Sequence, residues 1–379
     1  MLAIHFPGKL VFGNGCITRM AEEVAEMAPQ RILVVTIAPL IDQLKEILQR
    51  WNGSGIEVLV NTAIVREPTY GDFHRLMAKA APFDPDVVLG IGGGSVLDVA
   101  KLVAAQLDNP QVLQDYVGTG LLKGRRKALI CVPATSGTGS EVSPNAILVD
   151  DSDNQKKGII SPYLVPDIVY VDPLLTLSVP PAVTAATGLD ALTHCMEAFT
   201  NKFAQPFIDL YALEGMRLIA AYLVQAVRHG ADKEARSSVA MGSLLGGFCL
   251  GPVNTAAVHA LSYPLGSRFH LPHGLSNALL LPHVMAFNLQ AAPERYARVA
   301  VALGCDAGGD DRDIAVRGVE KIRELIKECG IPATLKEAGV PESAMADLAA
   351  EAIKVTRLLR NNPRELTVED AFQIYKAAF

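Results

Sequence analysis

The sequence predicts an α/β domain built on a parallel sheet, followed by a domain of helices alone. In the first half of the chain, short apolar segments alternate with stretches of helical periodicity. In the second half, long Ala- and Leu-rich stretches follow one another. The length of 379 residues exceeds what one hydrophobic core normally holds. We therefore expect two domains, over residues 1–179 and 180–379, with the Pro pair 180–181 at the boundary.

The first domain contains five short apolar segments with the length and composition of buried strands. The segments are rich in Val, Ile and Leu, and helical stretches separate the first four. Strands that alternate with helices pair in parallel, so we expect both faces of the sheet to be covered. The last segment is expected to close the sheet. The segments are 31–36, 57–60, 85–91, 128–132 and 168–172.

The second domain is predicted to be all-helical because strand-like runs almost vanish after the Pro pair. Its helical stretches have the length of ordinary globular helices and carry mainly Ala and Leu. They cover residues 182–200, 206–228, 236–249, 294–304, 313–329 and 343–354.

Composition excludes several classes of protein. Half of the residues are hydrophobic, which argues against disorder, and a net charge of −6 gives no electrostatic basis for binding nucleic acid. The N-terminus does not resemble a signal peptide, and no uninterrupted apolar run reaches the roughly 18 residues of a membrane span. The six cysteines form no CxxC pair, which is typical of reduced thiols. We expect a cytoplasmic protein that binds no membrane.

A glycine-rich turn directly follows the third predicted strand. Gly92, Gly93, Gly94 and Ser95 stand where that strand ends and a helix begins. Glycines let the backbone approach a pyrophosphate closely, and the amides at a helix start favour an anion. Residues 90–95 form an incomplete GxGxxG motif, because Ser95 stands where the motif has its last glycine. A glycine-rich turn without a ligand is the alternative.

A second turn of small residues follows the fourth predicted strand, over residues 133–141. It supplies backbone amides and the hydroxyls of Thr135 and Thr138. If the third and fourth strands are neighbours in a parallel sheet, both turns lie at the edge where α/β proteins bind nucleotides. The two turns together favour a nucleotide site.

Four residues of the second domain are candidate metal ligands. Asp190 and His194 are four residues apart and project from one face of the predicted helix. An ordinary hydrogen bond between them is the alternative. His259 lies in an apolar helical stretch, and His273 lies between Pro and Gly at a helix start. A set of mixed oxygen and nitrogen donors suits Fe²⁺ or Zn²⁺ and does not suit Ca²⁺.

Six motifs occur in an order that resembles the iron-containing (group III) alcohol dehydrogenase family. The resemblance runs from end to end of the chain. It rests on GGGSVLDVAK (92–101), PATSGTGSE (133–141), GLDALTH (188–194), HALSYPLG (259–266), PHGLSNALLLPHV (272–284) and NNPRELTVEDAF (361–372).

The resemblance implies a Rossmann-like N-terminal domain and a helical C-terminal domain, the architecture of dehydroquinate synthase, in a homodimer. It also implies a metal-dependent oxidoreductase that transfers a hydride between NAD(P) and a small alcohol or aldehyde. The ion, Fe²⁺ or in its place Zn²⁺ or another divalent ion, would act as a Lewis acid. By position, the resemblance assigns Asp190, His194, His259 and His273 to the metal, and Gly92, Gly93, Gly94, Ser95, Asp98, Lys101, Thr135 and Thr138 to the cofactor.

Two positions depart from the family pattern. Many members have a second histidine four residues after the third ligand, proposed to relay a proton, and this chain has Tyr263. Tyr263 either relays the proton or fills the pocket wall, and it is a catalytic candidate together with His273. Many members also have Asp where this chain has Ile37, so the usual cue for NAD over NADP is missing.

The sequence leaves four alternative functions, two of which its motifs disfavour. A zinc-dependent glycerol or polyol dehydrogenase shares the fold, but the GLDALTH and PHG motifs argue against it. A hydroxyacid dehydrogenase of the same superfamily is a second possibility. Maleylacetate reductase-like members lack a full ligand set, whereas four candidates are present in this chain. A non-catalytic protein that binds a nucleotide or a metal is the alternative outside enzymes.

Overall fold

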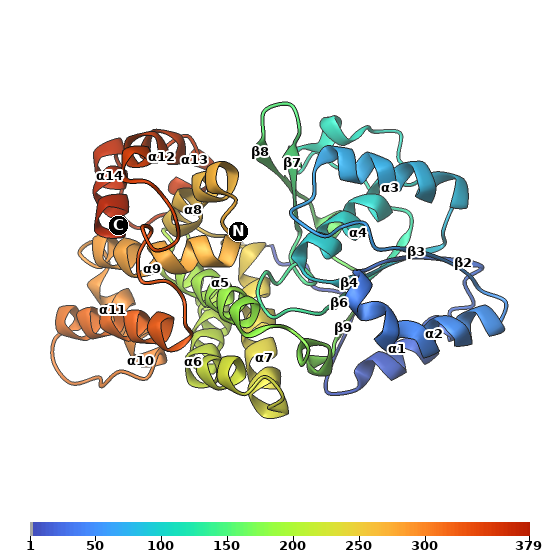
Figure 1. Cartoon of the computed structure of the whole chain (residues 1–379), viewed down its shortest axis with the longest axis horizontal. Coiled ribbons are helices and arrows are strands. Elements are labelled where there is room, and N and C mark those ends of the chain that lie inside the picture. Colours follow the sequence, from blue (N-terminus) through green and yellow to red (C-terminus); the bar gives the residue numbers. More distant parts are fainter. Residues whose placement is uncertain (1–2) are drawn as a thin grey trace. The chain divides into compact units, whose positions relative to one another are not determined.

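A computed structural model of the chain describes residues 3–379 and divides into two compact units (Figure 1). The first unit contains the chain up to Thr135 and residues 140–176, and the second contains residues 136–139 and 177–379. The chain thus leaves the first unit for good after Thr176, close to the expected boundary at 179/180. Within the described residues, no helix is long and apolar enough to cross a membrane.

The first unit is built on a six-stranded sheet in which all strand pairs are parallel. The strand order is β1-β9-β6-β4-β2-β3, so β4 lies between β2 and β6. The strands are short and apolar, as expected for strands that are buried on both faces. Their bounds are Lys9–Phe12 (β1), Arg31–Val35 (β2), Glu57–Asn61 (β3), Val87–Gly92 (β4), Ala128–Pro133 (β6) and Ile168–Val171 (β9).

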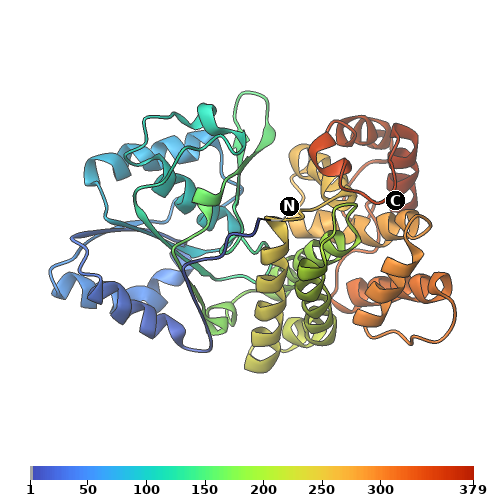
Figure 2. The ribbon, with the colours of Figure 1, turned by 180° about the vertical axis from the view of Figure 1, so that it is seen from behind.

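Helices cover both faces of this sheet, as Figures 1 and 2 show. Side chains of β2 alternate between two cores: Ile32 packs on one side, with α1 and α2, and Leu33 packs on the other, with α3 and α4. This alternation explains why the strands read as continuous apolar runs. The helices are Cys16–Glu26 (α1), Ile41–Gly53 (α2), Tyr70–Phe83 (α3) and Gly94–Gln106 (α4).

Parts of the first unit differ from the sequence-based expectation. Segment 168–172 was expected to close the sheet, but β9 lies inside it, and the N-terminal β1 forms that edge. A small second sheet, in the order β5-β8-β7, was not predicted. Strand β8 begins with three polar residues, Gln155 to Lys157, and the apolar run of β7 is only four residues long, from Ala146 to Val149. The strands are Gly118–Thr119 (β5), Asn145–Asp150 (β7) and Gln155–Ile160 (β8).

The second unit is helical, and α5 is its most buried helix. From Gly188 to Thr200 every residue of α5 is buried, which is typical of a helix surrounded by others. Proline at the first position begins α5, α6 and α10, where its missing N–H costs nothing. The helices are Pro181–Thr200 (α5), Pro206–Arg228 (α6), Lys233–Leu250 (α7), Ala257–Phe269 (α8), His273–Asn288 (α9), Pro293–Ala302 (α10), Asp311–Glu328 (α11), Met345–Ala352 (α12), Thr356–Leu359 (α13) and Val368–Ala377 (α14).

Candidate metal and cofactor sites

Three helices of the second unit bring the candidate metal ligands together. Helix α5 carries Asp190 and His194 one turn apart, α8 carries His259 near its start, and His273 is the first residue of α9. The first three side chains are buried, and His273 keeps 31% of its side chain exposed. The cluster is therefore enclosed by protein except at His273, which contacts solvent.

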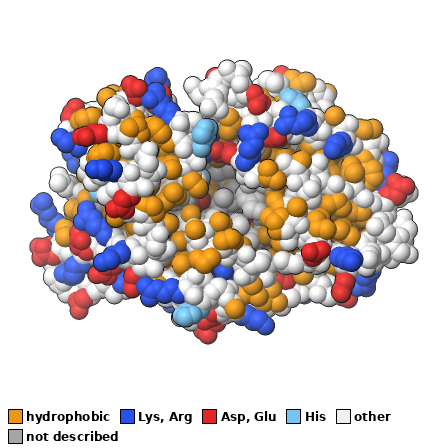
Figure 3. All heavy atoms as spheres, in the orientation of Figure 1, with side chains coloured by type: hydrophobic (Ala, Val, Ile, Leu, Met, Phe, Trp, Pro, Cys, Tyr) orange, Lys and Arg blue, Asp and Glu red, His pale blue; other side chains and the backbone are white. Residues whose placement is uncertain are grey.

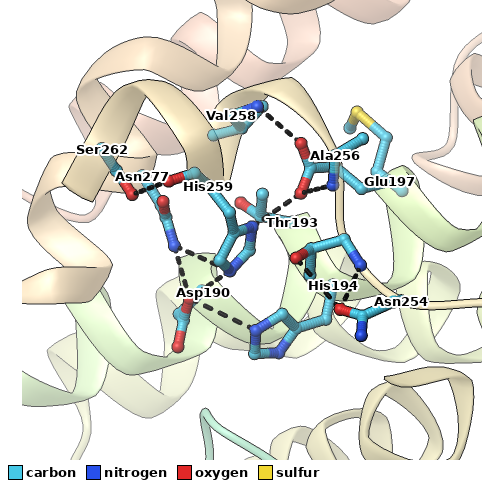
Figure 4. A network of polar contacts seen from close by, with 12 residues as sticks. Asp190, Thr193, His194, Glu197, Asn254, Ala256, Val258, His259, Ser262 and Asn277 are labelled. Carbon is cyan, nitrogen blue, oxygen red and sulfur yellow. Dashed lines mark hydrogen bonds and ion pairs between the residues drawn. The ribbon is translucent and has the colours of Figure 1, made fainter. Parts of the chain in front are cut away.

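Three imidazoles converge on one carboxylate oxygen, Oδ1 of Asp190. Figure 4 shows those of His194 and His259. The imidazole Nε2 lies 3.7 Å from this oxygen in His194 and 3.6 Å in both His259 and His273. These separations are longer than hydrogen bonds. They fit donors on a common ion, because ligands about 2.1 Å from a tetrahedral ion lie about 3.4 Å from one another. The set of one carboxylate and three imidazoles suits Fe²⁺ or Zn²⁺.

The four ligand candidates are not equivalent in position. Atoms of Asp190, His259 and His273 all lie within 4.8 Å of one another. His194 approaches Asp190 from the same helix, and its ring stacks on that of His259 with centroids 4.8 Å apart. Three residues thus form the compact part of the cluster, and His194 flanks it.

Electrostatics ties the cluster together. Burial raises the pKa of the Asp190 carboxyl, but the imidazoles of His194, His273 and His259 outweigh burial and hold this pKa below its ordinary value. Burial likewise lowers the pKa of His194. Burial also lowers that of His259, but Glu197 and Asp190 outweigh it and raise this pKa to about 9. The Asp190 carboxylate is thus stabilised by positive charge, which a divalent ion would also supply.

Two further polar residues of this cluster were missed from the sequence. Asn277 donates from Nδ2 to Asp190 Oδ1 at 2.7 Å, and Glu197 lies 2.6 Å from Nδ1 of His259. Asn277 stands four residues after His273, and Glu197 three residues after His194. Helical spacing places both on the ligand face of their helices, so this periodicity was the signal that could have found them.

A glycine allows α9 to begin against α5. A Cβ atom on Gly274 would lie 2.1 Å from the carbonyl oxygen of Ala186. Such a distance is a severe clash with backbone, so only glycine fits after His273. In the PHG motif, His273 is thus a candidate ligand, and Gly274 is required by the close packing of α9 on α5.

Tyr263 lies beside the candidate metal cluster. It follows His259 by one turn of α8, and its ring centroid is 6.2 Å from that of His273. The structure thus places its ring next to His273, the candidate ligand that is partly exposed to solvent.

In the first unit, the two predicted cofactor turns begin at adjacent strand ends. Gly92 of β4 is paired in register with Pro133 of β6. Gly93 is the N-cap of α4, and Thr135 Oγ1 lies 3.4 Å from the position of a Cβ on Gly93. The expected neighbourhood of the turns is confirmed by this pairing. Backbone amides at the start of α4, at Gly94 and Ser95, form the kind of site that binds phosphate.

Lys101 and Asp98 hold the end of the second turn and the chain that follows it. Lys101 is fully buried, and its Nζ donates to Ser140 Oγ at 3.0 Å and to the carbonyls of Ser143 and Asn145 at 2.9 and 2.7 Å. Asp98, one turn earlier on α4, accepts from Ser140 Oγ at 2.5 Å. Burial lowers the pKa of Lys101, which Asp98 counteracts. Lys101 therefore fixes the end of the second predicted cofactor turn through hydrogen bonds.

Thr138 belongs to segment 136–139, which groups with the second unit. Gly139 in this segment has φ +61°, and a Cβ there would lie 2.3 Å from the Cα of Gly247 in α7. The segment therefore packs tightly on a helix of the second unit. The predicted cofactor residues are thus divided, with Thr138 in one unit and the other seven in the other.

Sequence comparison identifies the family. The sequence pattern described as iron-containing alcohol dehydrogenase matches residues 7–173, and the C-terminal pattern of the Fe-containing alcohol dehydrogenase family matches residues 184–379. The chain is 40% identical to a long-chain-alcohol dehydrogenase of Geobacillus thermodenitrificans, over 99% of this chain and 96% of that protein. It is 32% identical to 1,3-propanediol dehydrogenase of Klebsiella pneumoniae, over 98% and 97%.

Solved structures agree with this assignment. A 1,3-propanediol oxidoreductase matches the whole of both chains with a TM-score of 0.96 and 32% identity. The NAD⁺ complex of sulfoacetaldehyde reductase from Bifidobacterium kashiwanohense matches with a TM-score of 0.88 and 28% identity, over 100% of this chain and 98% of that one. The chain belongs to the iron-containing alcohol dehydrogenase family. It is therefore an oxidoreductase that acts on alcohols with a nicotinamide cofactor.

Proposed function

We propose that this chain interconverts small primary alcohols and aldehydes at a divalent ion held by Asp190, His194, His259 and His273. The observation that carries the proposal is the convergence of three imidazoles on one carboxylate oxygen at 3.6–3.7 Å. A divalent ion bound there supplies a Lewis acid that favours the alkoxide form of the substrate oxygen. The charge and the donor types of the cluster suit Fe²⁺, and Zn²⁺ competes for such donors.

We propose that the protein binds the cofactor pyrophosphate at Gly92, Gly93, Gly94 and Ser95. The start of α4 offers amide donors and the positive end of a helix dipole. The protein positions the nicotinamide and the substrate so that hydride passes directly between them. Tyr263, beside His273, is the candidate for the group that moves the proton of the substrate hydroxyl.

The choice between NAD and NADP depends on the end of β2. Ile37 follows this strand directly after Thr36, and it forms an isolated bridge with Ala63. An apolar side chain there neither accepts a hydrogen bond from a ribose hydroxyl nor repels a 2′-phosphate. Both cofactors are therefore compared in the assay.

A cytoplasmic homodimer is part of the proposal. All six cysteines are free, and five are buried, which suits a reducing compartment. On the face seen in Figure 3, cationic and anionic side chains intermingle, which suits a small-molecule enzyme better than a protein that binds nucleic acid. Light scattering of the purified protein measures the oligomeric state directly.

The test is an anaerobic assay of the metal-free protein reloaded with Fe²⁺ or Zn²⁺. NADH and NADPH oxidation is followed with straight-chain aldehydes of increasing length, and the reverse reaction with glycerol and a 2-hydroxy acid. We expect metal-dependent turnover of aldehydes and little of the other two substrates. A preference for glycerol would indicate a polyol dehydrogenase. Tight metal binding with no turnover of any substrate would overturn the proposal in favour of a binding protein.

A further inference from the structure

We infer that Glu197 is a positioning residue of the metal site, which fixes the tautomer of His259 that presents Nε2 as a ligand. The inference rests on the proposed metal site and extends it to a residue that does not touch the ion. Glu197 lies on α5 three residues after His194 and is 4% exposed. A buried carboxylate in this place requires partners, and the structure provides three.

The partners of Glu197 are all at the start of α8 (Figure 4). Its Oε2 accepts from the Ala256 amide at 2.9 Å and lies 2.6 Å from Nδ1 of His259, and its Oε1 accepts from the Val258 amide at 2.6 Å. Two of the three partners are backbone N–H groups, which can only donate. One side chain of α5 therefore fixes both the backbone and the imidazole of the opposing helix.

The chemistry of these contacts assigns the tautomer. An ionised carboxylate only accepts hydrogen bonds, so Nδ1 of His259 must carry a proton at 2.6 Å from it. A neutral imidazole protonated on Nδ1 has its lone pair on Nε2. This Nε2 is the atom that lies 3.6 Å from Asp190 Oδ1. A carboxylate that orients a ligating histidine in this way typically contributes a factor of about 10–100 in metal affinity.

Glu197→Gln tests this assignment because it preserves the shape of the side chain but leaves only one of its two terminal atoms able to accept hydrogen bonds. The new amide group must face either the Val258 N–H or the side shared by Ala256 and His259. The first arrangement opposes two donors. The second lets His259 accept at Nδ1, which moves its proton to Nε2, away from the geometry of a ligand. The first arrangement leaves Nδ1 a neutral, weaker acceptor in place of the carboxylate, and the second reverses the tautomer, so both weaken metal binding.

A matched control is Asp209→Asn in the same unit. Asp209 on α6 is 8% exposed, and its two oxygens accept from Arg295 at 2.7 and 2.8 Å. This variant also removes one buried negative charge without a change of shape, but it does not contact the metal cluster. It therefore measures the effect of lost stability alone.

The experiment titrates metal-free protein with Zn²⁺ in competition with a chromophoric chelator, and it records the rise in melting temperature on Zn²⁺ addition. We expect Glu197→Gln to lose about 10–100-fold in affinity and most of this rise, while Asp209→Asn melts lower but binds as wild type. Glu197→Asp, which keeps the charge one methylene further back, should lose less than Glu197→Gln.

Four results would overturn the inference. Wild-type affinity in Glu197→Gln rejects it, and if that variant does not fold, wild-type affinity in Glu197→Asp rejects it. Equal losses in Glu197→Gln and Asp209→Asn reject it, because the effect would then follow stability. Wild-type protein that binds Zn²⁺ no better than Asp190→Asn rejects the proposed metal site itself, and the inference with it.

Discussion

At the scale of single residues, Tyr263 is the position where the chemistry of this chain departs from the pattern of its family. Its phenol stands one turn after His259 and beside His273. A phenol is a poorer general base than an imidazole, but it can pass a proton through water. Removing the hydroxyl separates a role in proton movement from a role in filling space.

Tyr263→Phe is expected to lower kcat without loss of metal. General acid–base groups contribute about 10²–10⁴ in rate, and a relay through water places this residue at the lower end. The ring remains, so packing around His273 is preserved. Turnover is measured against pH, with the metal content of each sample. Unchanged kcat at every pH would show that Tyr263 only forms part of the wall.

The residues of the metal cluster differ in how far the sequence predicts them. Histidines such as His259 and His273 are unusual in an apolar helical region, so residue type alone makes them candidate ligands. The structure brings them together with Asp190. Glu197 and Asn277 are polar residues of ordinary type within helices. Helical spacing places them on the same faces as the candidate ligands, but their partners depend on which helix lies opposite, and a single sequence does not contain that information.

At the scale of elements, the turn between β4 and α4 depends on close packing of backbone and side chains. A Cβ on Gly92 would lie 2.8–3.0 Å from the three branched atoms of Val96. Val96 is buried and β-branched, so it has little freedom to move. The strand thus ends close to the first turn of the helix, with the amides of α4 beside it.

Gly92→Ala is expected to displace the start of α4. The clash should raise KM for NADH at least severalfold and lower stability by about 1–3 kcal/mol, the usual cost of overpacking. Gly124→Ala is the matched control, because a Cβ at Gly124 meets nothing within 4 Å. Cofactor titration by fluorescence and urea unfolding compare the two. Equal behaviour of both variants would contradict the importance of this packing.

Elements were predictable where one physical signal dominates. Strands β2, β4 and β6 read as apolar runs because both of their faces are buried, and α5 and α6 read as long Ala- and Leu-rich helices. Strands β7 and β8 pair with each other through polar residues such as Lys156 and Lys157, opposite Val149 and Leu148. The two strands form a hairpin across residues 151–154, and the polar residues at the start of β8 hide it from a search for apolar runs.

At the scale of the whole molecule, the fold class follows from the order of elements, whereas the strand order does not. Alternation of strands and helices implies a parallel sheet, and the helical second unit implies separation of the two cores. The position of β9 inside the sheet depends on β1, whose four residues Lys9–Phe12 are too short to stand out. The strand order, which the sequence did not reveal, is therefore determined by the pairing of strands far apart in the chain.

Acid stability of the whole chain is expected to depend on His283, a residue of α9 remote from the proposed chemistry. Burial, and secondarily Arg323, lowers its pKa from 6.5 to about 4. Between these values the unfolded chain binds a proton that the folded chain does not, so stability falls as the pH drops from 6.5 towards 4. The loss is at most about 3 kcal/mol, because one pKa unit corresponds to about 1.4 kcal/mol.

His283→Gln should flatten this dependence, whereas His229→Gln, at an exposed position, should not. Urea unfolding followed by helical circular dichroism across this pH range measures the slopes, and parallel curves for wild type and His283→Gln would show that His283 does not carry the effect.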